Sequence, residues 1–278
     1  MTECRVEGNA APADPNRSKA MRRYHSLRDH VNFLLHRHLA ARDLESGAAG
    51  IGAMLPDLWR MADRRVRASA AVSPADTDGP RGHVLAGINH HIQVDRWFHG
   101  DEVFVEGERL TLASFRNAGV KAPKLGLFAH VTWEMALDGA LLRREGLDRT
   151  LAILRNDLAG VGGEPLSAAA SAHHFDRIER SPGARAAFDD VMSQLFASIS
   201  DEPWIGGYRT GTGIARRLDG MRNRMGLGRL DADAKVAVAA AIETLTPVAD
   251  HMLGRILLRW PGPAGTSDPG PGTRAFEP

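Results

Sequence analysis

The spacing of apolar and polar positions predicts helices along most of the chain. From Ser18 to Arg42 neither Pro nor Gly occurs, and apolar side chains recur at intervals of three and four residues. Similar segments follow at 87–99, 111–121, 125–142, 147–158, 184–200 and 231–259. No segment shows the strict alternation that is typical of a half-buried strand. The pattern therefore predicts an all-α protein of roughly seven to nine helices.

Segments rich in Pro and Gly divide the chain into one helical domain and two tails. Residues 1–17 and 261–278 lack any periodic apolar pattern, and we predict flexible tails there. The domain is expected to span 18–260. Within it, Gly47 to Gly52 and Ser73 to Gly82 are expected to interrupt the helices. Pro56 is compatible either with the first turn of a new helix or with a kink inside a longer one.

Composition narrows the class of protein only slightly. Hydrophobic residues make up 43% of the chain and charged residues 25%, which is ordinary for a globular protein. No apolar run reaches the roughly 18 residues of a membrane helix, and a net charge of +1 gives no argument for a nucleic-acid partner. Cys4 is the single cysteine, so no disulfide framework is expected. Because the N-terminus lacks a secretory signal, we expect a cytoplasmic protein.

The segment G-I-N-H-H-I-Q-V-D-R-W-F-H, which ends at His99, contains the clearest candidate chemistry. In a helix, His91, Asp95 and His99 lie on one face, because residues four apart stack above one another. Ile88 and Ile92 flank this face and indicate that it borders the interior. A carboxylate beside imidazoles in such a place needs a cation or a hydrogen-bond network. The helix therefore predicts part of a polar site.

A second helix repeats this arrangement. His130, Glu134 and Asp138 are spaced i, i+4, i+8 in a segment with apolar side chains nearly all round, as expected of a buried helix. Two further candidates come earlier in the chain. His36 lies in the first helix, where a structural histidine is the alternative, and Asp57 lies between apolar neighbours, where a helix cap is an equal alternative.

Histidines and carboxylates without cysteine suit Mn, Fe, Zn or Co, or Mg when water completes the coordination shell. One or two such ions would lower the pKa of a bound water and polarise a phosphoryl oxygen, so hydrolysis is the expected chemistry. No serine lies in the strand-turn-helix elbow of serine hydrolases. The glycine-rich stretch 204–224 has neither of the usual phosphate-loop spacings, which excludes a dinucleotide fold.

Four sequence blocks, in order over about residues 30–225, resemble the acyl carrier protein phosphodiesterases. The first is N-F-L-L-H-R-H-L-A from Asn32, similar to that family's N-F-L-A-H-L-H-L-A. G-A-M-L-P-D ends at Asp57 and corresponds to G-N-L-L-A-D. G-I-N-H-H-I-Q-V-D ends at Asp95 and corresponds to G-I-x-x-H-R-x-I-D. The last comprises Tyr208-Arg209 and then L-D-G-M-R-N-R, which ends at Arg224 and matches L-x-G-M-x-N-R.

The resemblance implies an HD-domain-like helical bundle and a metal-dependent phosphodiesterase. The positions that it assigns to the metal are His36, Asp57, His91 and Asp95. It also implies that the substrate is a small phosphoester or a phosphopantetheinylated carrier protein. The following residues are candidates for substrate contact: Tyr208, Arg209 and Arg224. For both arginines, a surface or structural salt bridge is the alternative.

The chain departs from that family at three carboxylate positions near the expected site. Phe98-His99 replaces a T-D pair, and His130 and Glu134 replace two aspartates. More imidazole favours metals softer than Mg. We therefore expect His99, His130 and Glu134 to complete the metal site or to act as catalytic acid and base. Two alternatives remain: a di-iron oxygenase with the same HD-like fold, and a metal-free helical binding protein whose site is closed by internal hydrogen bonds.

Overall fold

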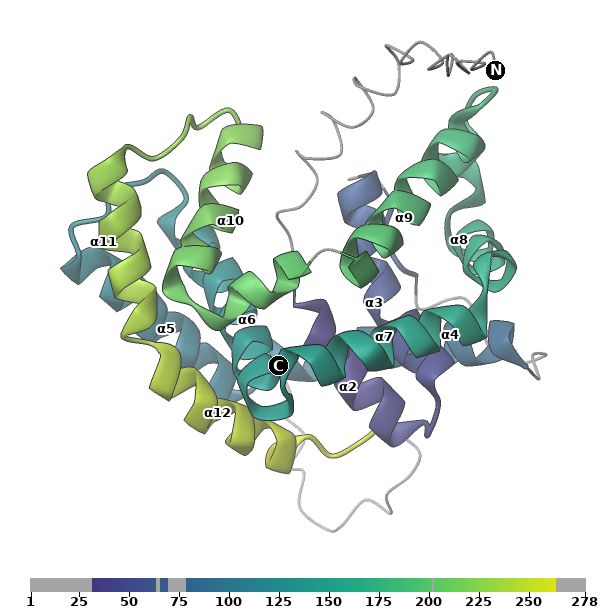
Figure 1. Ribbon diagram of the computed structural model, residues 1–278, viewed down its shortest axis with the longest axis horizontal. Helices are drawn as coiled ribbons and strands as arrows, with labels where there is room; N and C mark the ends of the chain where they lie inside the picture. The colour runs from purple at the N-terminus through teal and green to yellow at the C-terminus, as the bar shows by residue number, and fades with distance from the viewer. Residues whose placement is uncertain (1–31, 64–65, 70–78, 202, 264–278) are drawn as a thin grey trace, which may run out of the picture.

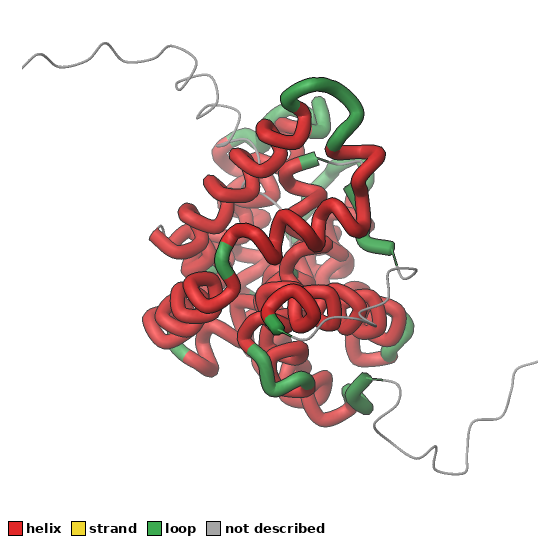
Figure 2. The backbone as a smooth tube through the Cα atoms, turned by 90° about the vertical axis from the view of Figure 1, so that its right-hand side faces the viewer, coloured by secondary structure: helices red, strands yellow, loops and turns green. Residues whose placement is uncertain are grey.

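The computed structural model describes residues 32–63, 66–69, 79–201 and 203–263. Its described residues contain helices and loops but no strand (Figure 2), so the all-α prediction is confirmed. The predicted tail at 1–17, the start of the first predicted helix and most of the predicted tail at 261–278 lie outside these residues. No single described helix is long and apolar enough to cross a membrane. Only the pair Ala232–Glu243 and Thr246–Arg259, with a bend of 44° between the two helices, passes that test.

The described residues hold eleven α-helices and one 3-10 helix, more than the seven to nine that the sequence predicts. They are α2 (Phe33–Asp43), α3 (Gly47–Ala62), α4 (Pro80–Phe98), α5 (Glu102–Asn117), α6 (Leu125–Glu145), α7 (Leu147–Val161), α8 (Gly163–Ile178), α9 (Ala184–Asp201), η1 (Pro203–Arg209), α10 (Gly211–Arg224), α11 (Ala232–Glu243) and α12 (Thr246–Arg259). One cause of the difference is that the predicted helix at 231–259 is divided, with a turn at Thr244 and Leu245.

Side-chain caps set the starts of α3 and α5, which the sequence did not predict, and Pro56 proves to lie inside a longer helix, the second of the two alternatives left open for it. Ser46 accepts a hydrogen bond from the Ala49 backbone N–H, and α3 therefore begins at Gly47, with Pro56 in its interior. The predicted break at Gly47 to Gly52 is thus helical. Asp101 accepts from the Val103 N–H at 2.9 Å, so α5 begins at Glu102 instead of near Thr111.

Helices α2, α3, α4 and α6 form the centre of the fold, with α5 and α10–α12 on one side and α8 and α9 on the other (Figure 1). Glycines let α3 and α4 pack backbone against backbone. A Cβ at Gly52 would lie 2.1 Å from the Val84 carbonyl oxygen, and one at Gly87 would lie 2.0 Å from that of Ala49. Because only glycine fits there, these residues bring the next turns of both helices close together.

The N-terminus of α2 is held by a side chain from α6. Asn32, at the N-cap position, makes no capping bond with its side chain. Instead, Asp138 on α6 accepts hydrogen bonds from the N–H groups of Leu34 at 3.1 Å and Leu35 at 2.9 Å. These are two of the donors that a helix start leaves without an intrahelical partner. Asp138 therefore fixes the position of the first turns of α2 against α6.

Candidate metal centre

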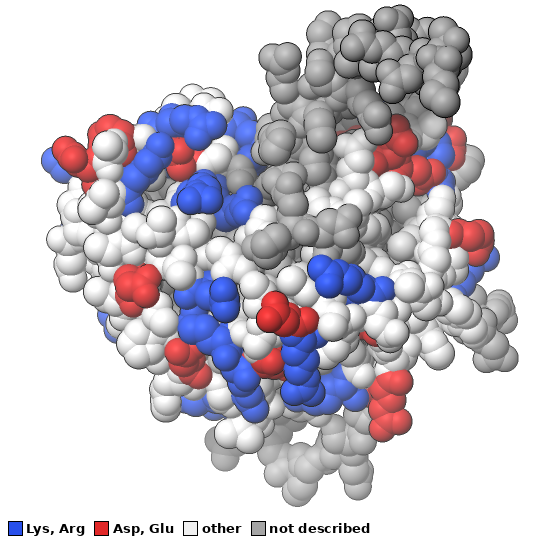
Figure 3. All heavy atoms as spheres, viewed as in Figure 1, with Lys and Arg blue, Asp and Glu red and all other residues white. Residues whose placement is uncertain are grey.

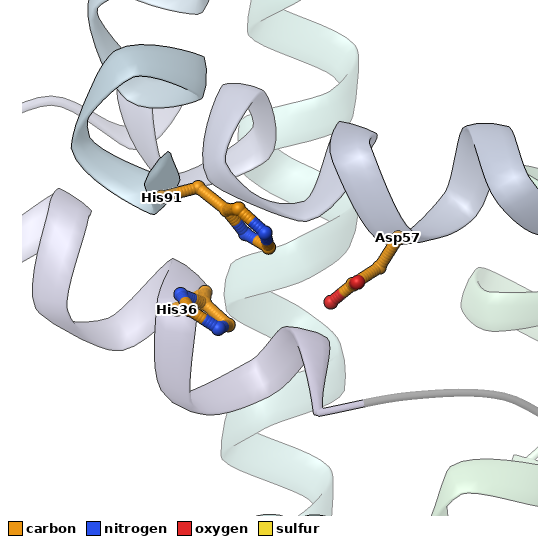
Figure 4. Close-up of side chains that lie close together, drawn as sticks. All are labelled: His36, Asp57 and His91. Atoms are coloured by element: carbon orange, nitrogen blue, oxygen red, sulfur yellow. The ribbon is translucent and has the colours of Figure 1, made fainter. Parts of the chain in front are cut away.

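The inner triad comprises His36 on α2, Asp57 on α3 and His91 on α4, whose side chains point toward one another (Figure 4). One ligand atom from each residue lies within 4.8 Å of the others. The side chains of His36 and His91 are 3% and 5% exposed, so the group is almost closed to solvent. Three helices far apart in sequence thus place two imidazoles and a carboxylate around one point.

Hydrogen bonds orient the imidazoles of the inner triad. The Nδ1 atom of His91 lies 2.8 Å from the Ala53 carbonyl oxygen, which can only accept, so Nδ1 carries the proton. In the neutral ring, Nε2 then presents its lone pair to the centre of the triad. The His36 and His91 rings are in contact, with centroids 3.9 Å apart. Two imidazolium ions would repel at that distance, whereas two neutral rings could share a cation.

Asp95 connects this triad to other imidazoles. Its Oδ1 lies 3.2 Å from His36 Nε2 and its Oδ2 lies 3.4 Å from His91 Nε2. The same Oδ1 lies 3.6 Å from Nε2 of His99, one turn further along the chain. The Asp95 side chain is 41% exposed. This carboxylate therefore stands at the boundary between the buried triad and solvent.

The outer triad comprises His99 at the end of α4 and His130 and Glu134 on α6. Its ligand atoms also lie within 4.8 Å of one another. Nε2 of His130 is 3.2 Å from Oε1 of Glu134, and the His99 and His130 rings stack with centroids 5.0 Å apart. The side chains are 39%, 28% and 16% exposed in chain order. The outer triad thus resembles the inner one in composition but is open to solvent.

Burial and neighbouring charges shift the pKa values of the inner triad. Burial, together with the adjacent His91, lowers the pKa of His36 to about 4, so this ring is neutral near pH 7. Burial raises the pKa of Asp57 to about 8, even though His91 opposes the shift. For His91, burial is outweighed by Asp57 and Asp95, which raise its pKa to about 9. Without a cation, protons on Asp57 and His91 balance the charge of this group.

The pKa values of the carboxylate between the triads and of the outer imidazole move in opposite directions. Burial would raise the pKa of Asp95, but hydrogen bonds from His36, His91 and His99 hold it well below its usual range. Glu134 raises the pKa of His130 to about 9 against the effect of burial. Asp95 is therefore ionised, and an ionised carboxylate surrounded by imidazole nitrogens is a suitable metal ligand.

The donor set fits a divalent cation. Among the described residues, no hydrogen-bond donor reaches the Asp57 carboxylate. A structural polar cluster would be expected to satisfy such groups internally. Metal–nitrogen bonds of about 2.1 Å place ligand atoms roughly 3.4–4.2 Å apart, so the inner triad needs to contract only slightly.

Two neighbouring histidines show what a structural role looks like in this fold. Nε2 of His90, next to His91, lies 2.9 Å from Asp43, which also accepts from the Trp260 indole. His38 forms an ion pair with Glu145 at 2.7 Å. Each histidine connects two helices through its own carboxylate partner, and neither belongs to a triad. On α4, His90 therefore makes a structural contact between helices, whereas the adjacent His91 is a candidate ligand.

Tyr208 is the first of the three residues that the sequence analysis names for substrate contact. Its ring is fully buried, and no group among the described residues forms a hydrogen bond with its hydroxyl. Burial raises the pKa of Tyr208, and the charges of Asp138, Asp57 and Glu134 contribute in the same direction. Arg217 opposes this shift and is therefore also near the hydroxyl. The backbone of Tyr208 packs against α6, because a Cβ at Gly139 would lie 2.0 Å from the Tyr208 carbonyl oxygen.

The two candidate arginines, Arg209 and Arg224, have different surroundings from Tyr208. Arg209 is exposed, and its Nε donates to the Gly206 carbonyl of its own 3-10 helix. Arg224 is half-buried at the end of α10, and burial lowers its pKa to about 10. The Arg209 contact thus stays within its own 3-10 helix. Arg217, which the sequence did not single out, is the arginine linked electrostatically to Tyr208.

Sequence reasoning missed two carboxylates in supporting positions. Glu108 on α5 lies 3.4 Å from Nδ1 of His130, but the predicted helix began after it and no local pattern marked it. Asp138 was placed on the polar stripe of His130 and Glu134, yet its oxygens face the backbone of α2. The spacing on α6 put Asp138 on the correct face, but only the packing of α2 reveals its use.

Comparison of the chain with family models, with curated proteins and with solved structures finds no match. The function must therefore be inferred from the site itself.

Proposed function

We propose that the protein is a metal-dependent phosphohydrolase that acts on phosphodiesters. The observation that carries this proposal is the convergence of seven histidine and carboxylate side chains from α2, α3, α4 and α6, in which Asp57 has no hydrogen-bond donor among the described residues. The inner triad and Asp95 would hold a divalent ion such as Mn, Fe, Zn, Co or Mg. Such an ion lowers the pKa of a bound water and polarises a phosphoryl oxygen.

The residues of this chain supply position and charge. The Asp138 contacts to α2 and the close packing of α3 on α4 hold the inner triad in place before any ligand binds. His36 offers a neutral imidazole near pH 7, because its pKa is lowered to about 4. The outer triad lies against Asp95, on the more exposed side. It is therefore placed either to transfer protons to and from the substrate or to provide further ligands.

Positive charge on α10, which packs against α6, supports a phosphate-bearing substrate. Helix α10 carries Arg216, Arg217, Arg222 and Arg224. In Figure 3, Lys and Arg side chains gather over the part of the surface where α10 lies. Arg217 stacks on Trp204, with its guanidinium carbon 4.8 Å from the ring centroid, and it interacts electrostatically with Tyr208. We assign phosphate contact to Tyr208 and Arg217, with Arg209 and Arg224 as outer contacts.

The resemblance to acyl carrier protein phosphodiesterases in four ordered blocks agrees with this proposal. It suggests a phosphopantetheinyl phosphodiester as one candidate substrate. A di-iron oxygenase is the second candidate function. It is favoured by the four imidazoles of the two triads, two in each. A metal-free binding module would be expected to close the site by internal hydrogen bonds, and the missing donor to Asp57 argues against it.

The test is hydrolysis of bis(4-nitrophenyl) phosphate by full-length protein. Metal-stripped protein should be inactive and should gain activity with Mn²⁺, Co²⁺, Zn²⁺ or Fe²⁺, and chelator should remove that activity. Asp57→Asn should lower the rate at least about 10³-fold, because it removes the charge of the inner triad. The matched control is Asp63→Asn at the end of the same helix. Oxygen consumption by ferrous protein without phosphoester hydrolysis would replace this proposal with the oxygenase.

A further inference from the structure

The outer triad has the geometry of a cation site of its own. Its three ligand atoms lie within 4.8 Å of one another, the same limit as for the inner triad. With bonds of about 2.1 Å, an ion at their centre would require roughly 3.4–4.2 Å between ligand atoms. The outer triad comes from only two helices, and the i, i+4 pair on α6 presents both of its ligand atoms to the same side.

A supporting carboxylate orients the ring of His130. Nδ1 of His130 lies 3.4 Å from Glu108 Oε2, and Nε2 faces Glu134 Oε1 at 3.2 Å. Histidines that bind metals commonly donate their remote ring N–H to a carboxylate or a carbonyl, which leaves the other nitrogen for the ion. The Ala53 carbonyl does this for His91 in the inner triad. Both triads therefore contain one imidazole fixed in the orientation that metal coordination requires.

Asp95 lies between the two triads. Its Oδ1 is 3.2 Å from His36 Nε2 and 3.6 Å from His99 Nε2, so one oxygen faces an imidazole from each triad. The other oxygen faces His91 at 3.4 Å. A carboxylate with this placement can bridge two ions. Centres with two ions about 3.5–4 Å apart stabilise both the attacking and the leaving oxygen in phosphoryl transfer.

We propose that His99, His130 and Glu134 bind a second divalent cation and that Asp95 bridges it to the ion of the inner triad. The inference rests on the proposed function for the inner ion, and it assigns the outer triad to metal binding instead of proton transfer. Two imidazoles with two carboxylates suit Mn²⁺, Fe²⁺ or Zn²⁺. Because the outer residues are more exposed than the inner ones, the second ion binds more weakly and exchanges faster.

Manganese titration of metal-stripped, full-length protein tests this assignment. Calorimetry should give two ions per chain for the wild type, with two separable affinities. His130→Ala should bind one ion, with the tighter affinity retained. His83→Ala is the matched control, because His83 is an exposed histidine on α4 outside both triads, and it should still bind two. Electron paramagnetic resonance should show an exchange-coupled manganese pair in the wild type and an isolated ion in His130→Ala.

A second variant protects the test against misfolding. Glu134→Gln keeps the size of the side chain and removes its charge, so it should also reduce the stoichiometry to one ion while its circular dichroism stays that of the wild type. One ion in the wild type, unchanged in His130→Ala and Glu134→Gln, would overturn the second site while leaving hydrolysis at the inner triad intact. Two coupled ions without hydrolysis of any phosphodiester would instead overturn the proposed function and leave the second site standing.

Discussion

The inner and outer triads use the same residue types but depend on the fold in different ways. The outer triad joins two helices, and its His130–Glu134 contact is an i, i+4 neighbour pair. The inner triad takes one residue from each of α2, α3 and α4 and is buried among them. The outer geometry is therefore largely local, whereas the inner geometry exists only after tertiary packing. Damage to the packing of α3 and α4 should affect the inner triad first.

The contrast extends to electrostatics. In the inner triad, burial dominates, and it moves the pKa values of His36 and Asp57 toward their neutral forms. In the outer triad, the contact with Glu134 dominates, and it favours the charged form of His130. Asp95 takes part in both environments. The same donor chemistry thus gives an inner triad with one neutral imidazole, His36, and an outer triad in which His130 is charged.

The largest expected effect comes from removing the carboxylate of Asp95, which contacts both triads. Asp95→Ala should abolish metal-dependent hydrolysis, by about 10³-fold or more, and should weaken both ions, because it deletes the charge between them. The measurements are metal content by elemental analysis and rate with saturating Mn²⁺. Asp101→Ala is not a suitable control, because Asp101 caps α5; the exposed Asp148 on α7 serves better.

Melting in chelator separates this effect from a structural one. Asp95 is 41% exposed, so metal-stripped Asp95→Ala should melt close to metal-stripped wild type. If the variant melts far below the wild type in chelator, and the wild type never held metal, then Asp95 is part of a structural ion-pair cluster. In that case α4 supports the fold and the metal site does not exist.

The sequence predicted the fold class and those parts of the candidate site that lie within a single helix. Apolar periodicity gave the helices, and spacing of four residues put His91, Asp95 and His99 on one face of α4. It could not show that His36 and Asp57 would meet them, because that contact depends on the glycine-lined packing of α3 on α4 and on the Asp138 contact with α2. The residue pattern named His36 and Asp57 only as candidates with structural alternatives, and the resemblance to a known family was what grouped them with His91 and Asp95.

Errors of the sequence analysis have a common physical origin. The starts of α3 and α5 are set by single side-chain caps, Ser46 and Asp101, which outweigh the helix-breaking tendency of nearby residues. Glu108 was missed because its role depends on the neighbouring helix α6 and not on α5 itself. Periodicity reports which face of a helix is buried. It carries no information on which side chain will lie opposite.

An effect of intermediate size is expected from His36 of the inner triad on the free energy of unfolding at acid pH. The folded pKa of His36, about 4, lies below its ordinary value of 6.5, so the unfolded chain binds the proton more readily. His36 therefore destabilises the fold progressively as pH falls from 6.5 toward 4, by on the order of 2–3 kcal/mol. His36→Gln should flatten the dependence of the unfolding free energy on pH in that range.

Urea unfolding in chelator at pH 6.5, 5.5 and 4.5 measures this difference. His83→Gln, which removes an exposed imidazole from α4, is the control and should keep the wild-type slope. Parallel curves for wild type and His36→Gln would mean that His36 is already protonated in the folded protein. The contrast between a neutral His36 in the inner triad and a charged His130 in the outer triad would then be wrong.

The smallest effect is expected from the carboxylate that supports the outer triad without joining it. Glu108→Gln keeps the shape of the side chain but removes the charge facing Nδ1 of His130. Loss of such a supporting partner typically weakens metal binding about 10–100-fold. The weaker of the two manganese affinities should fall by that factor while the tighter one is unchanged. Glu106→Gln is the matched control on α5, because Glu106 pairs with Arg109 at the surface. Equal weakening of both ions would show that the triads are a single coupled site, and no change in either would show that Glu108 does not orient His130.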